Sequence, residues 1–190
     1  AVMSFDVERR GRMISQAELS AYTHMLAVAV TDALLHFIGH NCQSPCTEAR
    51  YQAVQGAHIV HMLRDMLEDA AVGYFNIPRE TIESSNFSFV NADHPAYRKW
   101  VKSRIELSLS LFKAGRAYLA QVKTLRCRLA GFAYVARFEW MAHAIRRNGY
   151  LLRVEYPERK SLKAGLWMAG KTLSSLLWFF RVKDELREHV

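Results

Sequence analysis

One stretch predicts both the fold and the chemistry of this chain: His58-Ile59-Val60-His61-Met62-Leu63-Arg64-Asp65-Met66-Leu67-Glu68-Asp69. Most of its residues favour helix, and at about 100° per residue Asp65 and Asp69 project from the same helix face. His58 and His61 lie one to two turns earlier, on or near that face. Two such close carboxylates repel each other unless a cation lies between them. Mg²⁺ in proteins takes one or two carboxylates and fills its shell with water and phosphate oxygens. The stretch therefore predicts a helix that binds a divalent cation.

The same spacing has an ordinary alternative, because acids four residues apart are common on exposed helices, where they are simply solvated. The residues after Asp69 favour the first interpretation. Gly73 is suited to end the helix and Pro78 to start the next, with a short apolar link between them. The pattern thus extends well beyond a pair of acids.

The whole string from Leu63 to Glu80, L-R-D-x-x-E-D-x-x-x-G-x-x-x-[I/L]-P-x-E, resembles the second aspartate-rich motif of the squalene and phytoene synthases. These enzymes join two prenyl diphosphates head to head. The resemblance spans residues 1–160. It includes Asp6 and Tyr22 near the start of the chain and an A-Y-x-x-R motif that ends at Arg137.

By this resemblance, Asp65 and Asp69 bind Mg²⁺ or Mn²⁺ that bridges to a prenyl diphosphate, and Glu68 supports the metal shell. These three are the expected catalytic residues. The expected substrate-binding residues are Arg64, near the phosphates, with Tyr22, His58, His61 and Tyr74. Ionisation of a prenyl diphosphate releases pyrophosphate, which metal ions and cationic side chains neutralise, while apolar helix walls shelter the carbocation from water. A reductive step with NADPH is implied only for a squalene-type product.

The chain departs from the family pattern at three places. Where the family has Q-x-x-N before R-D, this chain has His58 and His61. Where the family has G-R-x-Y-L-P, this chain has Gly73-Tyr74-Phe75-Asn76-Ile77-Pro78, so an arginine and a tyrosine are absent from their usual positions. The family's first motif, D-x-x-x-D, is expected before residue 1. Residues 1–190 are therefore expected to form part of one squalene/phytoene synthase-like domain, its C-terminal two-thirds.

Two other functions stay open. The first is a non-catalytic relative that acts as an interaction or assembly module, which the departures would permit. The second is a metal-dependent phosphohydrolase, because His58, His61 and Asp65 form H-x-x-H-x-x-x-D, a set that suits zinc, iron or manganese and could activate water. Such sites usually recruit ligands from several helices, and the other histidines show no comparable pairing.

Periodicity predicts an all-α helical bundle, since no strand alternation of useful length occurs. Neither G-x-G-x-x-G nor a P-loop is present, which excludes the usual nucleotide-binding folds. With 51% apolar residues among 190, the chain can bury a core. The expected elements are a lead-in loop over 1–14, a helix capped by Ser15 and Glu18 up to residue 38, a helix over 48–73, a turn within 79–92, a helix over 97–119 capped by Asp93, a helix over 126–147 and an amphipathic helix over 161–186.

A net charge of +8 favours acidic partners. Nucleic acid is not expected, because the basic residues are scattered and form no recognised motif. Prenyl diphosphates and anionic membrane surfaces fit the charge. Residues 161–186 are expected to pack on the domain, with peripheral membrane contact as the alternative, since Lys163, Lys171 and Arg181 interrupt the apolar run needed to span a bilayer.

Three cysteines, an odd number, and no secretory signal predict a reduced, cytoplasmic compartment. The sequence does not predict a particular oligomeric state. Because helices preceding residue 1 would normally cover apolar surface, these 190 residues in isolation are expected to self-associate and to lack turnover.

Overall fold

The computed structural model describes residues 2–38, 47–85 and 93–187, with side chains described up to Ser174 in the last segment. Its elements are α1 (Val2–Arg9), α2 (Gln16–Ile38), α3 (Ala49–Ala71), α4 (Arg79–Ser85), α5 (Pro95–Gln121), α6 (Leu125–Arg147), the 3₁₀ helix η1 (Pro157–Lys160) and α7 (Leu162–Arg187). Within these residues, β pairing is limited to one isolated bridge between Met13 and Phe75. The predicted all-α fold is confirmed.

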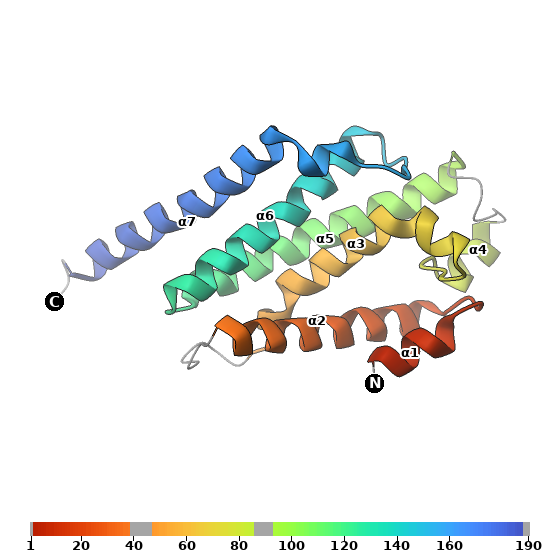
Figure 1. Ribbon diagram of the computed structural model, residues 1–190, viewed down its shortest axis with the longest axis horizontal. Coiled ribbons are helices and arrows are strands. Elements are labelled where there is room, and N and C mark those ends of the chain that lie inside the picture. Colours follow the sequence, from red (N-terminus) through yellow and green to blue (C-terminus); the bar gives the residue numbers. More distant parts are fainter. Residues whose placement is uncertain (1, 39–46, 86–92, 188–190) are drawn as a thin grey trace.

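Helix α3 lies at the centre of the bundle, against α2, α5 and α6 (Figure 1). Its buried residues are small or aliphatic and include Ala53, Ala57 and Val60. The contact with α5 is especially close, because a Cβ added to Gly115 would lie 2.6 Å from the Cβ of Ala53. This contact holds α3 against α5, and Asp65 of α3 lies at the edge of the core, where it is partly buried.

The ends of α2 and α3 agree with the sequence pattern. The Ser15 hydroxyl accepts a hydrogen bond from the Glu18 N–H at 3.1 Å, and the Glu18 carboxylate accepts one from the Ser15 N–H at 2.7 Å. This is the expected capping box. After α3 the chain turns at Gly73, whose φ of 91° is unfavourable for other residues.

Two local expectations are wrong. Residues 2–9 form α1 and not a loop, because tertiary contacts stabilise this short segment: Phe5 lies 5.1 Å from Tyr22 between ring centroids, and Arg9 is buried. The cap of α5 is His94 and not Asp93. His94 Nδ1 accepts from the Ala96 N–H at 3.2 Å, while Asp93 forms an ion pair with Arg98.

The last helix, α7, packs on α6, and its described C-terminal backbone extends past the end of the bundle (Figure 1). Ala164 is buried, and Trp167 Nε1 donates to the Ala136 carbonyl at 3.2 Å. The opposite side carries Leu162, Leu166 and Leu173, which are 80%, 66% and 58% exposed. The expected packing on the domain is therefore present, together with an apolar stripe that faces solvent.

Among the described helices, α2 alone has the length and hydropathy to cross a membrane, a property that core helices of globular proteins share. The apolar window of α2 is 22% buried, and the buried residues of this helix include Leu19, Tyr22 and Ala27.

Candidate active site

The two predicted metal ligands lie one turn apart on α3, and both are partly buried. Burial raises the pKa of Asp69 above its usual range; a hydrogen bond from Asn76 opposes this shift, and the negative charge of Asp65 adds to it. A cation between the two carboxylates would relieve both the burial of charge and the repulsion. The pair thus has the electrostatics of a cation site.

Arg64 holds the Asp65 carboxylate in place. Its Nε and Nη2 donate to the two Asp65 oxygens at 2.5 Å each, and Nη2 also lies 2.8 Å from His61 Nε2. His61 Nδ1 is 3.4 Å from Asp65 Oδ2. Because each carboxylate oxygen has a second lone pair, Asp65 can bind a cation while it accepts from Arg64. Burial lowers the pKa of His61, and the charge of Arg64 adds to this shift, so the ring favours its neutral form.

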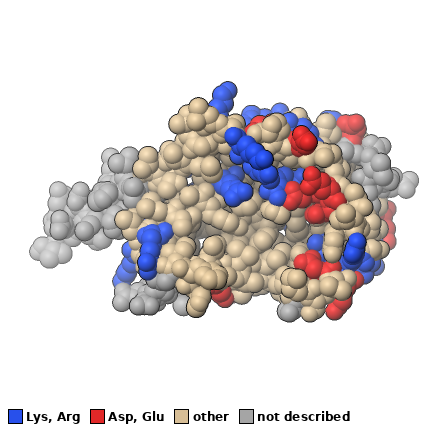
Figure 2. Space-filling model, viewed as in Figure 1, with Lys and Arg blue, Asp and Glu red and all other residues tan. Residues whose placement is uncertain are grey.

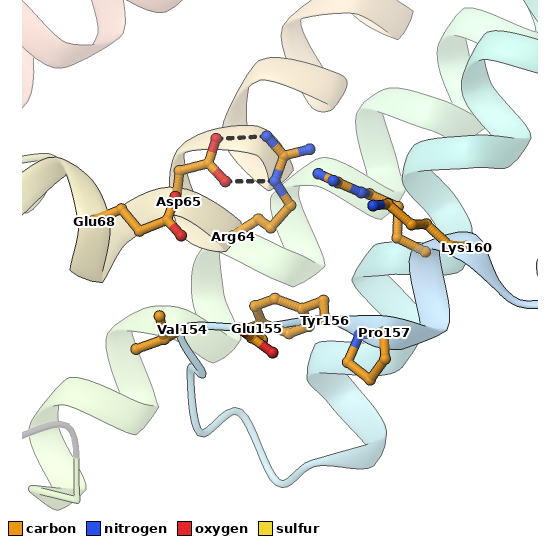
Figure 3. Close-up of a pocket in the computed structure, with 9 residues that line it drawn as sticks. Arg64, Asp65, Glu68, Val154, Glu155, Tyr156, Pro157 and Lys160 are labelled. Carbon is orange, nitrogen blue, oxygen red and sulfur yellow. Dashed lines mark hydrogen bonds and ion pairs between the residues drawn. The ribbon is translucent and has the colours of Figure 1, made fainter.

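A cavity of about 450 Å³ lies beside Arg64, Asp65 and Glu68 (Figure 3). Its opposite wall is formed by η1 and the residues just before it, with Glu155, Tyr156, Arg159 and Lys160 among the lining residues. Glu68 is exposed and lines this cavity. We call this space the α3–η1 cavity.

A wider hollow of about 850 Å³ shares Arg64, Arg159 and Lys160 with the α3–η1 cavity and adds Arg137 of α6. Figure 2 shows basic and acidic side chains side by side on this face of the molecule. In the part of the chain that the structure describes, no acidic side chain forms an ion pair with Arg137, Arg159 or Lys160. Cations gathered without carboxylate partners favour an anionic ligand.

The sequence alone did not identify Arg159 and Lys160 as site residues. They lie far from α3 along the chain, and no local spacing connects the two segments. The available signal was weak: a basic pair directly after the Tyr156-Pro157 break. Arg137 was identified only as part of the A-Y-x-x-R motif.

An apolar pocket of about 110 Å³ adjoins the wider hollow that contains Arg137, since both are lined by Ala130 and Tyr134. Its walls come from α2, α3, α5 and α6 and include Leu34, Val54 and Leu119. Burial raises the pKa of Tyr134 to about 12, so its hydroxyl stays protonated where the polar and apolar spaces meet. An anionic group and an apolar chain on one ligand would both find matching surface here.

Two predicted substrate-binding residues lie elsewhere. Tyr22 is buried and donates to Asp6 at 2.7 Å. Its ring centroid is 4.6 Å from the guanidinium carbon of Arg9, and that of Tyr74 is 4.8 Å from the same atom. Both tyrosines therefore contact Arg9, on the Asn76 side of Asp69, and line none of the cavities described above.

His58 also lies apart from these cavities. Burial lowers its pKa to about 4, and the charge of His61 contributes, so the ring is neutral near pH 7. Its Nε2 is buried and has no hydrogen-bond partner among the described residues. Over residues 2–38, 47–85 and 93–187, no three histidine, cysteine or acidic side chains are grouped to hold a metal ion. A cation at Asp65 and Asp69 would need oxygen atoms from water or phosphate to complete its shell.

Comparisons with known proteins address the fold and the family. A family model described as squalene/phytoene synthase matches residues 1–164. Among solved structures, the chain is similar to the squalene synthase HpnC from Alicyclobacillus acidocaldarius, with a TM-score of 0.64 and 19% identity over 78% of this chain. The match covers 57% of that longer chain. At this identity the likeness shows a shared fold. No curated protein matches the chain at a significant level.

Proposed function

The chain belongs to the squalene/phytoene synthase family, and from this premise we propose that its α3 site binds the diphosphate group of a prenyl diphosphate through a divalent cation. In the complete protein this site would serve the head-to-head condensation of two prenyl diphosphates, with release of pyrophosphate. The observation that carries the proposal is the α3–η1 cavity, which is lined by Asp65 and Glu68 of α3 and by Arg159 and Lys160 of η1.

The donor atoms fit Mg²⁺ or Mn²⁺. Asp65 and Asp69 would hold the cation, since both offer hard carboxylate oxygens. Asp65 lines the α3–η1 cavity, which has room for water and phosphate oxygens, and Asp69 lies one turn further along α3, outside the lining of that cavity. When bound, the cation would neutralise charge on the leaving pyrophosphate. NADPH belongs to this proposal only if the product is of the squalene type.

The chain's own cations would bind the leaving group directly. Arg64, Arg137, Arg159 and Lys160 present positive charge to a space that a diphosphate can enter. Preorganised charge of this kind stabilises the charge that develops as the carbon–oxygen bond breaks. Tyr134 and Phe138 lie beside these cations and would limit the access of water to the carbocation.

A non-catalytic binding module is the second candidate. The observation that favours it is the replacement of the motif arginine and tyrosine by Tyr74 and Asn76. Such a protein would bind a prenyl diphosphate without turning it over. Substrate binding and pyrophosphate release, measured on the full-length protein, separate the two candidates.

Peripheral membrane contact through α7 is part of the proposal. Leu162, Leu166 and Leu173 lie on one side of this helix and are exposed, and Lys163 is exposed beside them. An apolar stripe next to basic side chains suits the surface of an anionic bilayer. A long prenyl chain would also partition into that bilayer.

The test of the site is calorimetric titration of the chain with Mn²⁺ and inorganic pyrophosphate. We expect pyrophosphate to bind in a Mn²⁺-dependent manner, and the variant Asp65→Ala/Asp69→Ala to lose this dependence. Glu106→Ala, which removes an exposed acid on α5, is the matched control and should bind as the wild type does. Equal affinity in the double variant and the wild type would remove the aspartates from the site.

A further inference from the structure

Arg9 of α1 is a buried cation outside the α3–η1 cavity. It is 6% exposed. Its Nε donates to Asp6 Oδ1 at 2.8 Å, and its Nη1 donates to Asn76 Oδ1 at 2.8 Å. The rings of Tyr22 and Tyr74 contact the guanidinium. A charge desolvated to this degree needs such partners, because an unpaired buried charge is strongly destabilising.

Asn76 connects Arg9 to Asp69. It is 1% exposed, and its Nδ2 donates to Asp69 Oδ2 at 2.7 Å. The two bonds fix the amide orientation, since the oxygen has to face the guanidinium and the NH₂ has to face the carboxylate. A flipped amide would place donor against donor and acceptor against acceptor. Arg9 thus determines which end of Asn76 meets Asp69.

We propose that Arg9 is a positioning residue for Asp69: through Asn76 it holds Oδ2 of this carboxylate and orients Oδ1 for the divalent cation. This inference rests on the proposed function of the α3 site. Among the described residues, hydrogen bonds to Asp69 side-chain oxygens involve Oδ2 and not Oδ1. Partners that hold a metal ligand from behind are known to tune metal affinity strongly.

The departures from the family motif support this role. Tyr74 and Asn76 stand where the family pattern has arginine and tyrosine, and both contact Arg9. In this chain the guanidinium that contacts residues 74 and 76 comes from α1. The Gly11 N–H donates to the Gly73 carbonyl at 2.8 Å, which keeps the end of α1 beside the motif.

The experiment measures Mn²⁺ affinity by calorimetry for the wild type and for Arg9→Met, which keeps a long apolar side chain and removes the donors. We expect affinity to fall about 10- to 100-fold. Simple charge arithmetic predicts the opposite, because removal of a nearby positive charge should strengthen cation binding. Because the charge of Arg9 also opposes the rise that burial causes in the pKa of Asp69, the titration is repeated at a higher pH; a weaker affinity that persists there reports lost positioning and not protonation of Asp69.

Two further variants show whether Arg9 acts through Asn76. Asn76→Ala should weaken Mn²⁺ binding to a similar degree, and the double variant Arg9→Met/Asn76→Ala should lose little more than either single variant. Arg9→Lys should recover part of the affinity. Should Arg9→Met fail to fold, Arg9→Lys and Asn76→Ala carry the comparison, with helix content checked by circular dichroism. Arg12→Met, which removes an exposed arginine of the same segment, is the control and should leave the Mn²⁺ affinity unchanged.

The outcomes separate the two proposals. A wild type without Asp65-dependent Mn²⁺ binding overturns the proposed function and the positioning role with it. A wild type that binds Mn²⁺, together with an Arg9→Met variant of equal or higher affinity, overturns the positioning role alone. Fully additive losses in the double variant would also overturn it, because Arg9 would then act independently of Asn76.

Discussion

Replacement of Gly115 by alanine should destabilise the fold, because it pushes α5 away from the helix that carries the candidate site. The added Cβ would lie 2.6 Å from Ala53 Cβ, 2.7 Å from its backbone nitrogen and 2.8 Å from its Cα. These atoms belong to the α3 backbone and its first side-chain carbon, so they cannot rotate away. Relief of the overlap requires the two helices to separate.

The expected magnitude follows from two opposing terms. Overpacking typically costs about 1–3 kcal/mol, and the rigid neighbours of Gly115 place this case near 3 kcal/mol. Alanine in a helix interior gains about 1 kcal/mol over glycine. The net loss of about 2 kcal/mol corresponds to a Tm lower by about 4–8 °C for a chain of this size.

The assay is thermal unfolding followed by circular dichroism, with two glycine controls. Gly165→Ala on α7 meets no atom within 4 Å and should raise Tm by about 2–4 °C. In Gly131→Ala the new Cβ would overlap the end of the Leu119 side chain, which can rotate, so its loss should be smaller than that of Gly115→Ala. A Tm for Gly115→Ala at or above the wild-type value would refute the packing argument.

Three further predictions concern the site and the surface. Arg159→Ala/Lys160→Ala should weaken pyrophosphate binding at least about tenfold in calorimetry, because each hydrogen bond to a charged group contributes about 1.5–3 kcal/mol. The partly buried His58 has a folded-state pKa of about 4, below its unfolded value. Its neutral form contributes fully to stability above the unfolded pKa, and protonation of the unfolded state removes this contribution as the pH falls. The contribution of His58 to the unfolding free energy should therefore drop by about 2 kcal/mol between about pH 7 and pH 5. Leu166→Asp/Leu173→Asp should abolish co-sedimentation with vesicles that contain an anionic phospholipid.

Each of these predictions has a matched comparison. Arg98→Ala/Lys102→Ala removes two exposed cations of α5 that form ion pairs with surface acids, and pyrophosphate affinity should not change. His58→Gln should show a flatter loss of stability toward low pH, and an unchanged slope would exclude His58 as its source. Leu107→Asp alters an exposed leucine on α5 and should leave vesicle binding intact. If Leu107→Asp and Leu166→Asp/Leu173→Asp bind vesicles equally, the α7 stripe is not the contact.

The sequence predicted the long helices well, because their apolar spacing and caps are local. The boundaries of α2 and α3 follow from the Ser15 capping box and the turn at Gly73. Helix α1 was not predicted, since it is short and charged residues follow it, and its stability comes from contacts such as the Arg9–Asn76 hydrogen bond, which joins segments far apart in sequence. Local propensity carries no information about such a contact.

The same contrast between local signals and long-range contacts applies to the residues of the candidate site. Arg64, Asp65 and Glu68 could be identified together because they share one helix and one motif. The opposite wall of the α3–η1 cavity could not, because Arg159 and Lys160 meet α3 only in the folded chain. The roles of Tyr22, His58, His61 and Tyr74 in substrate binding stay predictions, and the first and last of these contact Arg9.

The changed motif positions bear differently on function once these contacts are considered. From the sequence, Tyr74 and Asn76 count as losses, because a phosphate-binding arginine and a site tyrosine are missing. In the structure, both residues hold a guanidinium supplied by α1, and Asn76 passes that constraint to Asp69. A metal ligand responds to where its hydrogen-bond partner lies and not to which segment carries it. Mn²⁺ affinity therefore tests whether the changed residues 74 and 76 still leave Asp69 in a binding geometry, and pyrophosphate release then separates a catalytic relative from a non-catalytic one.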